Sequence, residues 1–405
     1  MGRLVSSACL LLSAGMLAAA IADTLVTLAT PAAARPASAR SEVASRPGRP
    51  PIAYVITDGV LDHGAGTVTP VNTATRQAGR SIRVGRVPAG IAITPNRRTA
   101  YVTNSGSGTV TPINTLTSRA GRPIKVGPNP GAIVITPNGK TAYVARDNGV
   151  IPISLPAGRP GKLIRAGLSS RGPDELALTP SGQTLYAEDR AGETVTPILT
   201  ATNTALKPVK VARGGFLGGF ALSPDGKTLY VTGPDGVFAV STATNRVLKD
   251  IQTGPDADVE QIAIAPGGKD AYVLNWTGSV IVINTTTSKI VRRITIPRSP
   301  GATGPGAIGF IPGRKIVYIV SSPNGVVFPV SMTTGALLKP IRLGPELTTT
   351  LSPAIAVTPS GTTAYVLAQR ARPDRSLVIP ISTATGTPLK PIRAGYQAAN
   401  ITVLP

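Results

Sequence analysis

The chain has 405 residues and a formal net charge of +22, with one cysteine and one histidine. A single histidine, His63, excludes a copper or zinc site built from several histidines and makes a Ser-His-Asp triad improbable. A single cysteine, Cys9, excludes an intramolecular disulfide framework.

Residues 1–34 have the pattern of a secretory signal peptide. Arg3 is followed by an apolar, uncharged stretch (4–21), and small residues then lead to the sequence ATPAAA at positions 29–34. This order predicts cleavage after Ala34 and a secreted or cell-envelope protein without a transmembrane segment in the mature chain. The alternative is an uncleaved N-terminal anchor, because the apolar stretch is close to the length that spans a bilayer.

Residues 35–50 are rich in Arg, Pro, Ala and Ser and are predicted to be a disordered linker. Residues 51–405 remain, which is ample for a large core. Because this region is repetitive, we expect it to form one domain despite its length.

A tyrosine recurs through this domain at intervals of 42 to 47 residues: Tyr54, Tyr101, Tyr143, Tyr186, Tyr230, Tyr272, Tyr318 and Tyr365. Seven copies have a proline six residues before the tyrosine: Pro95, Pro137, Pro180, Pro224, Pro266, Pro312 and Pro359. A repeat of about 40–50 residues indicates a solenoid or a propeller. The constant spacing indicates a tight hairpin, because a hairpin cannot change length without changing its register.

Each repeat reads as four short strands. The first is apolar on both faces, as in Ile91-Ala92-Ile93, and the proline ends it because proline cannot donate to a ladder. Turn residues and the Tyr-Val strand follow, then a third strand such as residues 110–114 and a fourth such as residues 340–343. With no helical period in the chain, this pattern predicts an all-β propeller of four-stranded antiparallel blades.

The sequence YVTN at residues 101–104 and the run TPNGKTAYV at residues 136–144 resemble the repeats of the YVTN family of β-propeller proteins. The resemblance covers about residues 51–405 and implies the propeller scaffold, but no single activity, because members of that family share a scaffold more than a function. Several copies depart from the motif, among them Tyr186-Ala-Glu-Asp. The Thr-Asn pair is therefore not expected to be a repeated functional site.

Eight blades are predicted, with seven as the alternative. The Tyr54 copy is preceded only by the linker, whereas the chain ends in a first strand without a repeat of its own, residues 400–405. We expect this C-terminal strand to become the innermost strand of the blade that contains Tyr54. The ring would then be closed and an unpaired edge removed.

The repeat register also assigns each loop to one end of the ring. Loops that join blades, and loops that follow Tyr-Val, share the end that we call the top, and they hold most of the acidic residues. Much of the basic surplus falls instead on the outer strands, in a set that we call the basic rim: Arg83, Lys125, Arg165, Lys210, Arg342 and Arg393. Cationic side chains on an outer strand block edge-to-edge pairing, which is the structural interpretation.

The functional interpretation of the basic rim is a surface for an anionic cell-envelope polymer, for phospholipid head groups or for nucleic acid. Nucleic acid is the least favoured of these partners. Only 4% of the residues are aromatic, which gives little support to base stacking, and no nucleic-acid-binding motif is present.

Carboxylates at the top surround the mouth of the predicted central channel, where propellers commonly bind ligands. The candidate ligand-binding residues are Asp174, Glu175, Asp256, Asp258, Glu260 and Glu346, all placed in blade-connecting loops. If they converge they could hold Ca²⁺ or a cationic ligand. Their spacing matches no Ca²⁺ loop motif, so the alternative is a set of solvated loop acids and no cofactor.

Aromatic residues give one further candidate. Trp276, the single tryptophan, falls in a top loop, where it could be a platform for a sugar or peptide or could pack against a neighbouring loop. The repeated tyrosines are predicted to be core residues whose hydroxyls bond to backbone.

These observations favour a secreted or cell-envelope propeller that acts as a non-enzymatic binding or scaffold module for a protein, peptide or carbohydrate, and we expect a monomer. No catalytic residue is identified. Two other hypotheses stay open: an enzyme, such as a metal-assisted lyase or hydrolase using carboxylates at the channel mouth, and a binder of anionic polymers through the basic rim.

Overall fold

The structure is a computed structural model. It describes residues 52–57, 65–167, 169, 172–212, 214–234, 236–254, 259–275, 277–297, 305–321, 325–344, 347–349, 354–370, 376–395 and 398–403. The predicted signal peptide and linker lie outside these residues.

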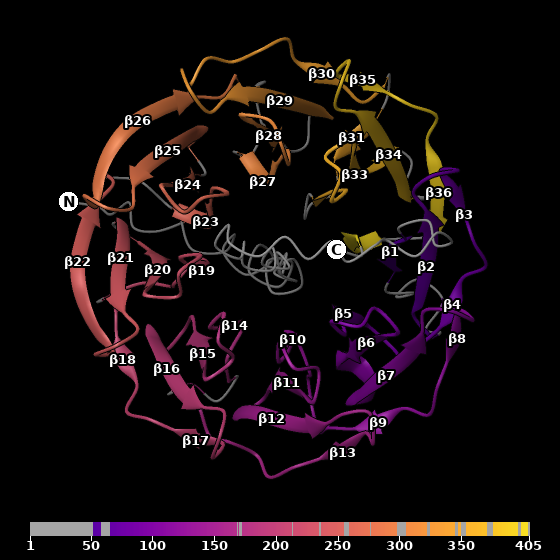
Figure 1. The fold of residues 1–405 in the computed structure, drawn as a ribbon, viewed down its shortest axis with the longest axis vertical. Helices are drawn as coiled ribbons and strands as arrows, with labels where there is room; N and C mark the ends of the chain where they lie inside the picture. Colours follow the sequence, from indigo (N-terminus) through magenta and orange to yellow (C-terminus); the bar gives the residue numbers. More distant parts are fainter. Residues whose placement is uncertain are drawn as a thin grey trace, which may run out of the picture.

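The described residues form eight antiparallel sheets arranged as blades around a common axis (Figure 1). The chain is therefore an eight-bladed β-propeller, as predicted, and the alternative of seven blades is wrong.

Blades 1 to 4 follow the first half of the chain. Blade 1 contains β1 (Ile52–Thr57), β2 (Thr67–Asn72), β3 (Gln77–Ala78) and β4 (Ile82–Arg83). Blade 2 contains β5 (Pro88–Ile93), β6 (Thr99–Asn104), the short 3-10 helix η2 (Ser105–Ser107), β7 (Thr109–Asn114), β8 (Arg119–Ala120) and β9 (Ile124–Lys125). Blade 3 contains β10 (Ile133–Ile135), β11 (Thr141–Arg146), β12 (Gly149–Ser154) and β13 (Arg159–Pro160). Blade 4 contains β14 (Glu175–Leu178), β15 (Thr184–Asp189), β16 (Thr194–Leu199), β17 (Thr204–Ala205) and β18 (Val209–Lys210).

Blades 5 to 8 complete the ring. Blade 5 contains β19 (Phe220–Leu222), β20 (Thr228–Gly233), β21 (Gly236–Ser241) and β22 (Arg246–Gln252). Blade 6 contains β23 (Val259–Ile264), β24 (Asp270–Asn275), β25 (Ser279–Asn284) and β26 (Lys289–Thr295). Blade 7 contains β27 (Pro305–Phe310), β28 (Ile316–Ser321), β29 (Val326–Ser331) and β30 (Ile341–Arg342). Blade 8 contains β31 (Leu347–Thr349), β32 (Ile355–Val357), β33 (Thr363–Arg370), β34 (Ser376–Ser382), β35 (Thr387–Pro388) and β36 (Ile392–Gly395).

The last strand, β37 (Ala398–Val403), closes the ring. It pairs antiparallel with β1, with Val55 opposite Ile401, and it lies on the inner side of blade 1 (Figure 1). The first blade therefore combines both ends of the domain, and the predicted closure is confirmed.

The constant Pro-to-Tyr spacing comes from a closed turn. In blade 2 the amide of Thr94, the residue before Pro95, donates to the carbonyl of Thr99 at 2.9 Å, and the Thr94 hydroxyl donates to the same carbonyl at 3.1 Å. The Thr99 amide donates back to that hydroxyl. The same bonds recur at Thr136, Thr179 and Thr358, so an inserted residue would break several hydrogen bonds at once.

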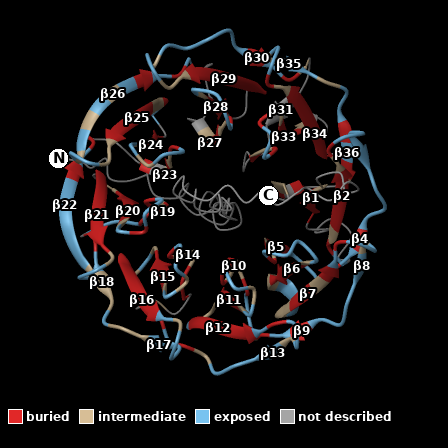
Figure 2. Ribbon diagram, viewed as in Figure 1, coloured by how far each residue is buried: buried red, intermediate tan, exposed pale blue. Residues whose placement is uncertain are grey.

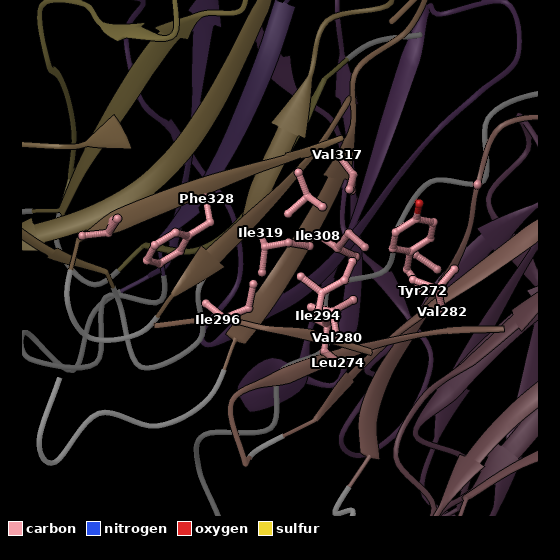
Figure 3. Packing of buried hydrophobic residues seen from close by; sticks show 14 residues of the cluster. Tyr272, Leu274, Val280, Val282, Ile294, Ile296, Ile308, Val317, Ile319 and Phe328 are labelled. Atoms are coloured by element: carbon pink, nitrogen blue, oxygen red, sulfur yellow. The ribbon is translucent and has the colours of Figure 1, made fainter. Parts of the chain in front are cut away.

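The core consists of apolar clusters that join successive blades. Inner and middle strands are mostly buried, whereas outer strands are exposed along the rim (Figure 2). Between blades 6 and 7, for example, Leu274 and Val280 pack with Ile308, Ile319 and Phe328 (Figure 3). Because each blade packs on two neighbours, the position of any top loop is set by the blade below it and by the adjacent one.

The repeated tyrosines are core residues, as predicted. Tyr143 and Tyr186 are almost fully buried, and each hydroxyl reaches the outer turn of the next blade. The Tyr143 hydroxyl donates to Asn203 Oδ1 at 2.7 Å and the Tyr186 hydroxyl to Asn245 Oδ1 at 2.9 Å. These bonds tie neighbouring blades together, and burial raises the pKa of Tyr186 to about 12.

Candidate functional site

The structure places only some of the predicted top carboxylates. Asp174 and Glu175 lie at the top of blade 4, and Glu260 lies in β23 of blade 6. Asp256, Asp258, Glu346 and the indole of Trp276 fall outside the described residues. Convergence of these loops on one ligand therefore stays a prediction.

The prediction that Glu175 and Glu260 lie in loops is wrong. Glu175 is the first residue of β14 and is paired with Glu188 in β15, while the ladder of β23 already begins at Val259 opposite Asn275. Both first strands extend further toward the top than the apolar pattern indicated, because the backbone ladder continues beyond the last apolar residue.

The Glu175–Glu188 pair is a feature of blade 4. Glu188 lies two residues after Tyr186, and Glu175 lies two residues before Ala177, the register partner of that tyrosine. In the other blades the equivalent positions hold no ionisable side chain: Asn400 and Ile56, Gly90 and Thr103, Ala132 and Ala145, Gly219 and Thr232, Gln261 and Leu274, Ala307 and Val320, and Ala354 and Leu367.

Blade 2 shows what this position does where it is not acidic. The Thr103 hydroxyl accepts from the Gly90 amide at 2.8 Å and donates to the Gly131 carbonyl of blade 3 at 2.7 Å. Threonine is thus a small clamp that satisfies backbone groups between two blades. In blade 4 a longer, ionisable side chain occupies the same position, opposite a second one.

Glu188 is buried without a partner. Its side chain is 0% exposed, and neither Oε1 nor Oε2 has a hydrogen-bond partner among the described residues. Burial, and then the nearby Glu175 carboxyl, raise the pKa of Glu188 well above its ordinary value. A buried carboxyl without hydrogen bonds is costly, so this side chain calls for a functional explanation.

Glu175 is partly exposed and points toward blade 5. Its Oε2 accepts from the Phe220 amide in β19 at 3.3 Å. Burial raises the pKa of Glu175 to about 8, although the Phe220 amide and the Arg190 guanidinium act in the opposite direction. The carboxyl pair therefore lies at the top of the interface between blades 4 and 5.

Neighbouring polar groups hold the backbone around this pair. Asp189 Oδ2 accepts from the Ser169 amide at 2.7 Å and its Oδ1 from the Gly192 amide at 2.9 Å, so this carboxylate serves the loops. Arg190 Nε donates to the Leu217 carbonyl at 2.7 Å, and the Arg190 amide donates to Asp174 Oδ2 at 3.2 Å.

The loop that leads into blade 5 presents an exposed aromatic ring beside these groups. Phe216 is 71% exposed. The residues on either side of it are held: the Gly215 amide donates to Glu193 Oε1 at 2.6 Å, and the Leu217 amide donates to the Arg190 carbonyl at 3.2 Å. Glu193 is itself paired with Lys210 at 2.5 Å. The ring is therefore displayed by a restrained loop.

The sequence carries one signal for Glu188, which lies in the departure Tyr186-Ala-Glu-Asp from the YVTN motif. Aligning the first strands on their tyrosine partners would have placed Glu175 opposite it. Burial of Glu188 could not be read from the alignment, because it depends on blade 5.

No metal centre is visible in the described part of the chain. No group of three or more His, Cys, Asp or Glu side chains there could hold a metal ion. The predicted Ca²⁺ site stays untested, because several of its proposed ligands lie outside the described residues.

The basic rim residues are exposed wherever the outer strands carry them. In β4, β9, β30 and β36 the cation follows a buried isoleucine: Ile82 precedes Arg83, Ile124 precedes Lys125, Ile341 precedes Arg342 and Ile392 precedes Arg393. Arg165 and Lys210 are exposed in the same way in blades 3 and 4. Blades 5 and 6 contribute none of these six residues, but their continuous outer strands also expose cations, Arg246, Lys249, Lys289 and Arg293, beside the apolar Leu248 and Val291.

A hollow at the opposite end of blades 4 and 5 is a weaker candidate. It is lined by Thr179, Pro180, Ser181, Gln183, Thr184, Asp225, Gly226 and Thr242. Its one carboxylate, Asp225, accepts from the Ser223 hydroxyl at 2.6 Å and the Lys227 amide at 3.0 Å. That carboxylate oxygen is therefore held by the turn itself.

Within the described residues, no helix is long and apolar enough to cross a membrane.

Comparison with known proteins supports the fold. No protein-family model and no curated protein matches the chain. Among solved structures, the chain resembles dihydro-heme d1 dehydrogenase NirN in complex with DHE, with 13% identity and a TM-score of 0.71 over 89% of this chain and 78% of that one. It also resembles apo AztD from Citrobacter koseri, with 14% identity and a TM-score of 0.63 over 87% and 98% of the two chains.

A third resemblance, to Kuenenia stuttgartiensis hydrazine synthase, has 22% identity and a TM-score of 0.50 over 68% and 89% of the two chains. At these identities the comparisons show a shared propeller architecture, and function has to be argued from the site.

Proposed function

We propose that this protein is a non-enzymatic binding module that acts outside the cytoplasm, secreted or at the cell envelope, and holds its ligand at the top of blades 4 and 5. The observation that carries the proposal is Glu188, a buried carboxyl opposite Glu175 that has no hydrogen-bond partner in the described part of the chain. Function on a repeat scaffold is expected where one repeat departs from the others.

The proposed location rests on the sequence of the N-terminus. Residues 1–34 have the order of charge, apolar stretch and small residues that is typical of an export signal. An uncleaved anchor would give the same side of the membrane. The repeated motif, a proline six residues before a tyrosine, further supports our inference that the chain is a YVTN-type propeller.

An enzyme is the second candidate, and one observation favours it. The pKa of Glu175 is raised to about 8, which is the property that a carboxyl needs in order to act as a general acid near neutral pH. We rank this candidate lower because burial also raises the pKa of Glu188, the carboxyl opposite Glu175, which disfavours the ionised form that would act as base or nucleophile.

A thermal-shift screen tests the proposal. The wild-type protein and the double variant E175Q/E188Q would be mixed with peptidoglycan fragments, short peptides, amines and oligosaccharides. We expect at least one compound to raise the Tm of the wild type but not of the variant, and to be recovered unchanged by mass spectrometry. Equal stabilisation of both proteins would overturn the proposed site, and a chemically altered compound would favour the enzyme.

A further inference from the structure

We propose that the Glu175–Glu188 pair is a binding site for the primary ammonium group of an organic amine, which enters between blades 4 and 5 and displaces protons from the two carboxyls. This inference rests on the proposed function and names the class of its ligand.

The acceptor set suits an ammonium group. Among the described residues Glu188 offers two oxygens without hydrogen-bond partners, and Glu175, which is paired with it in the ladder, uses its Oε2 for the Phe220 amide and keeps Oε1 as a third acceptor. An alkylammonium carries three N–H donors and no acceptor. Three carboxylate oxygens can therefore satisfy it completely, with charge-assisted hydrogen bonds.

Access is from the top. Glu175 is partly exposed, whereas Glu188, its partner in the ladder, is fully buried, so the proposed ligand meets Glu175 first. Arg190 attracts both carboxyls, and its Nε donates to the Leu217 carbonyl of the neighbouring loop.

The groups around the pair explain why the two carboxyls favour their protonated forms before binding and release protons when an ammonium binds. Glu175 and Glu188 are influenced by Asp174, Asp189 and Arg190, and burial outweighs the attraction of the arginine. With its pKa raised to about 8, Glu175 retains a proton near neutral pH, and burial favours the protonated form of Glu188 as well. When an ammonium binds, its positive charge stabilises the carboxylates, and the released protons pass to the buffer.

Two observations favour an organic amine over a metal ion. First, the described residues contain no group of three metal-ligating side chains here, whereas Ca²⁺ takes six to eight oxygen ligands. Second, the exposed ring of Phe216 lies on the loop that Arg190 and Glu193 restrain beside the pair. An aromatic ring at that place can cover the apolar body of the ligand.

The test is calorimetric titration of the full protein with 2-phenylethylamine, at pH 7 in phosphate and in HEPES, neither of which carries a primary amine. These buffers differ in ionisation heat, so the difference reports protons released on binding. We expect proton release on binding, and we expect E188Q to weaken binding by about tenfold or more. D225N removes one carboxylate at the opposite end and should bind like the wild type. The neutral analogue 2-phenylethanol should not bind.

The opposite results would overturn the inference. Binding of 2-phenylethylamine without proton release, or equal binding by E188Q, would exclude the pair as the site. Competition by CaCl₂ at millimolar concentration would indicate a metal site instead. The proton count is measured on the wild type and decides the matter even if E188Q does not fold.

Failure of this inference can be separated from failure of the proposed function. If a neutral compound binds the wild type but not E175Q/E188Q, the proposed binding module stands and the proposed ammonium ligand is rejected. If no compound depends on these residues, both proposals fall.

Discussion

At the scale of single residues, the position two after the repeated tyrosine differs between blades in what its side chain does. Thr103 and Thr232 bond to the backbone of their own first strand, at Gly90 and Gly219. Glu188 occupies the same position but satisfies none of its oxygens within the described residues. A substitution that gives up hydrogen bonds and buries a carboxyl lowers stability, which is the usual trade at a functional site.

The pKa shifts of this pair predict how stability changes with pH. Glu175 titrates at about 8 in the folded protein against an ordinary value of 4.5, and Glu188 is shifted in the same direction. The folded state thus holds protons that the unfolded chain has lost. The free energy of unfolding should fall as pH rises from about 4.5 through about 8.

E188Q removes one of the two carboxyls that cause this fall in the free energy of unfolding. At pH 8 it should exceed the wild type in unfolding free energy by about 1–3 kcal/mol, measured by urea denaturation. E193Q is the control, because hydrogen bonds from Lys210 and Gly215 lower the pKa of Glu193. The contribution of Glu193 to stability is present at neutral pH and lost in acid. E193Q should therefore reduce the pH dependence of the unfolding free energy only at acid pH. An unchanged alkaline slope in E188Q would contradict the assignment.

The repeated tyrosines give a second prediction at this scale. Y143F removes the bond to Asn203 and should cost about 1 kcal/mol. Y272F should be neutral or stabilising, because the Tyr272 hydroxyl is buried without a partner among the described residues while its ring keeps an edge contact with Phe310. Urea denaturation of both variants checks this; equal losses would show that hydroxyl bonding is not what distinguishes them.

At the scale of elements, the closing strand matters most. β37 supplies the innermost ladder of blade 1 and places Ala398 and Ile401 in the cluster between blades 8 and 1. Without β37 the inner edge of β1 would be unpaired, and the cluster between blades 8 and 1 would lose Ala398 and Ile401. Closure therefore links the first and last blades into one cooperative structure.

Deleting residues 399–405 should lower the free energy of unfolding by at least about 3 kcal/mol, since burial of Ile401 alone is worth roughly that much. The measurement is thermal unfolding followed by circular dichroism. T402A, which changes a half-buried side chain in the same strand, should shift stability by less than about 1 kcal/mol. A truncated protein that melts like the full chain would refute ring closure as a source of stability.

At the scale of the whole molecule, charge is arranged by strand position. The exposed cations of the outer strands alternate with buried isoleucines, which is the arrangement expected where an edge must not pair with another copy. The formal net charge of +22 also keeps molecules apart in solution.

Replacing the six basic rim residues by serine should therefore promote self-association, measured by light scattering after size-exclusion chromatography. A control with the same loss of charge replaces six exposed cations of the Pro-turns: Arg97, Arg98, Lys140, Lys227, Lys269 and Lys315. The control should remain monomeric. If instead the rim variant stays monomeric and loses salt-sensitive retention on an anionic resin, the rim is a polyanion-binding surface.

The sequence by itself determined the propeller, its eight blades and its closure. These follow from local rules repeated along the chain: a fixed turn after each proline and an alternation of strand and turn. Closure follows because the first repeat lacks its first strand and the domain ends in an extra first strand. The exposed rim follows from the same register. Each of these features depends on residues close together in the chain, or on counting repeats.

Only the tertiary structure decided where a ligand site can be. The sequence predicts Asp174 and Glu175 in a blade-connecting loop at the channel mouth, but Glu175 is a strand residue opposite Glu188 and bonded to Phe220 of the next blade. Burial and the lack of hydrogen-bond partners at Glu188 result from packing between blades 4 and 5. The physical reason is that desolvation depends on everything that surrounds a side chain, and a repeat pattern describes only its own blade.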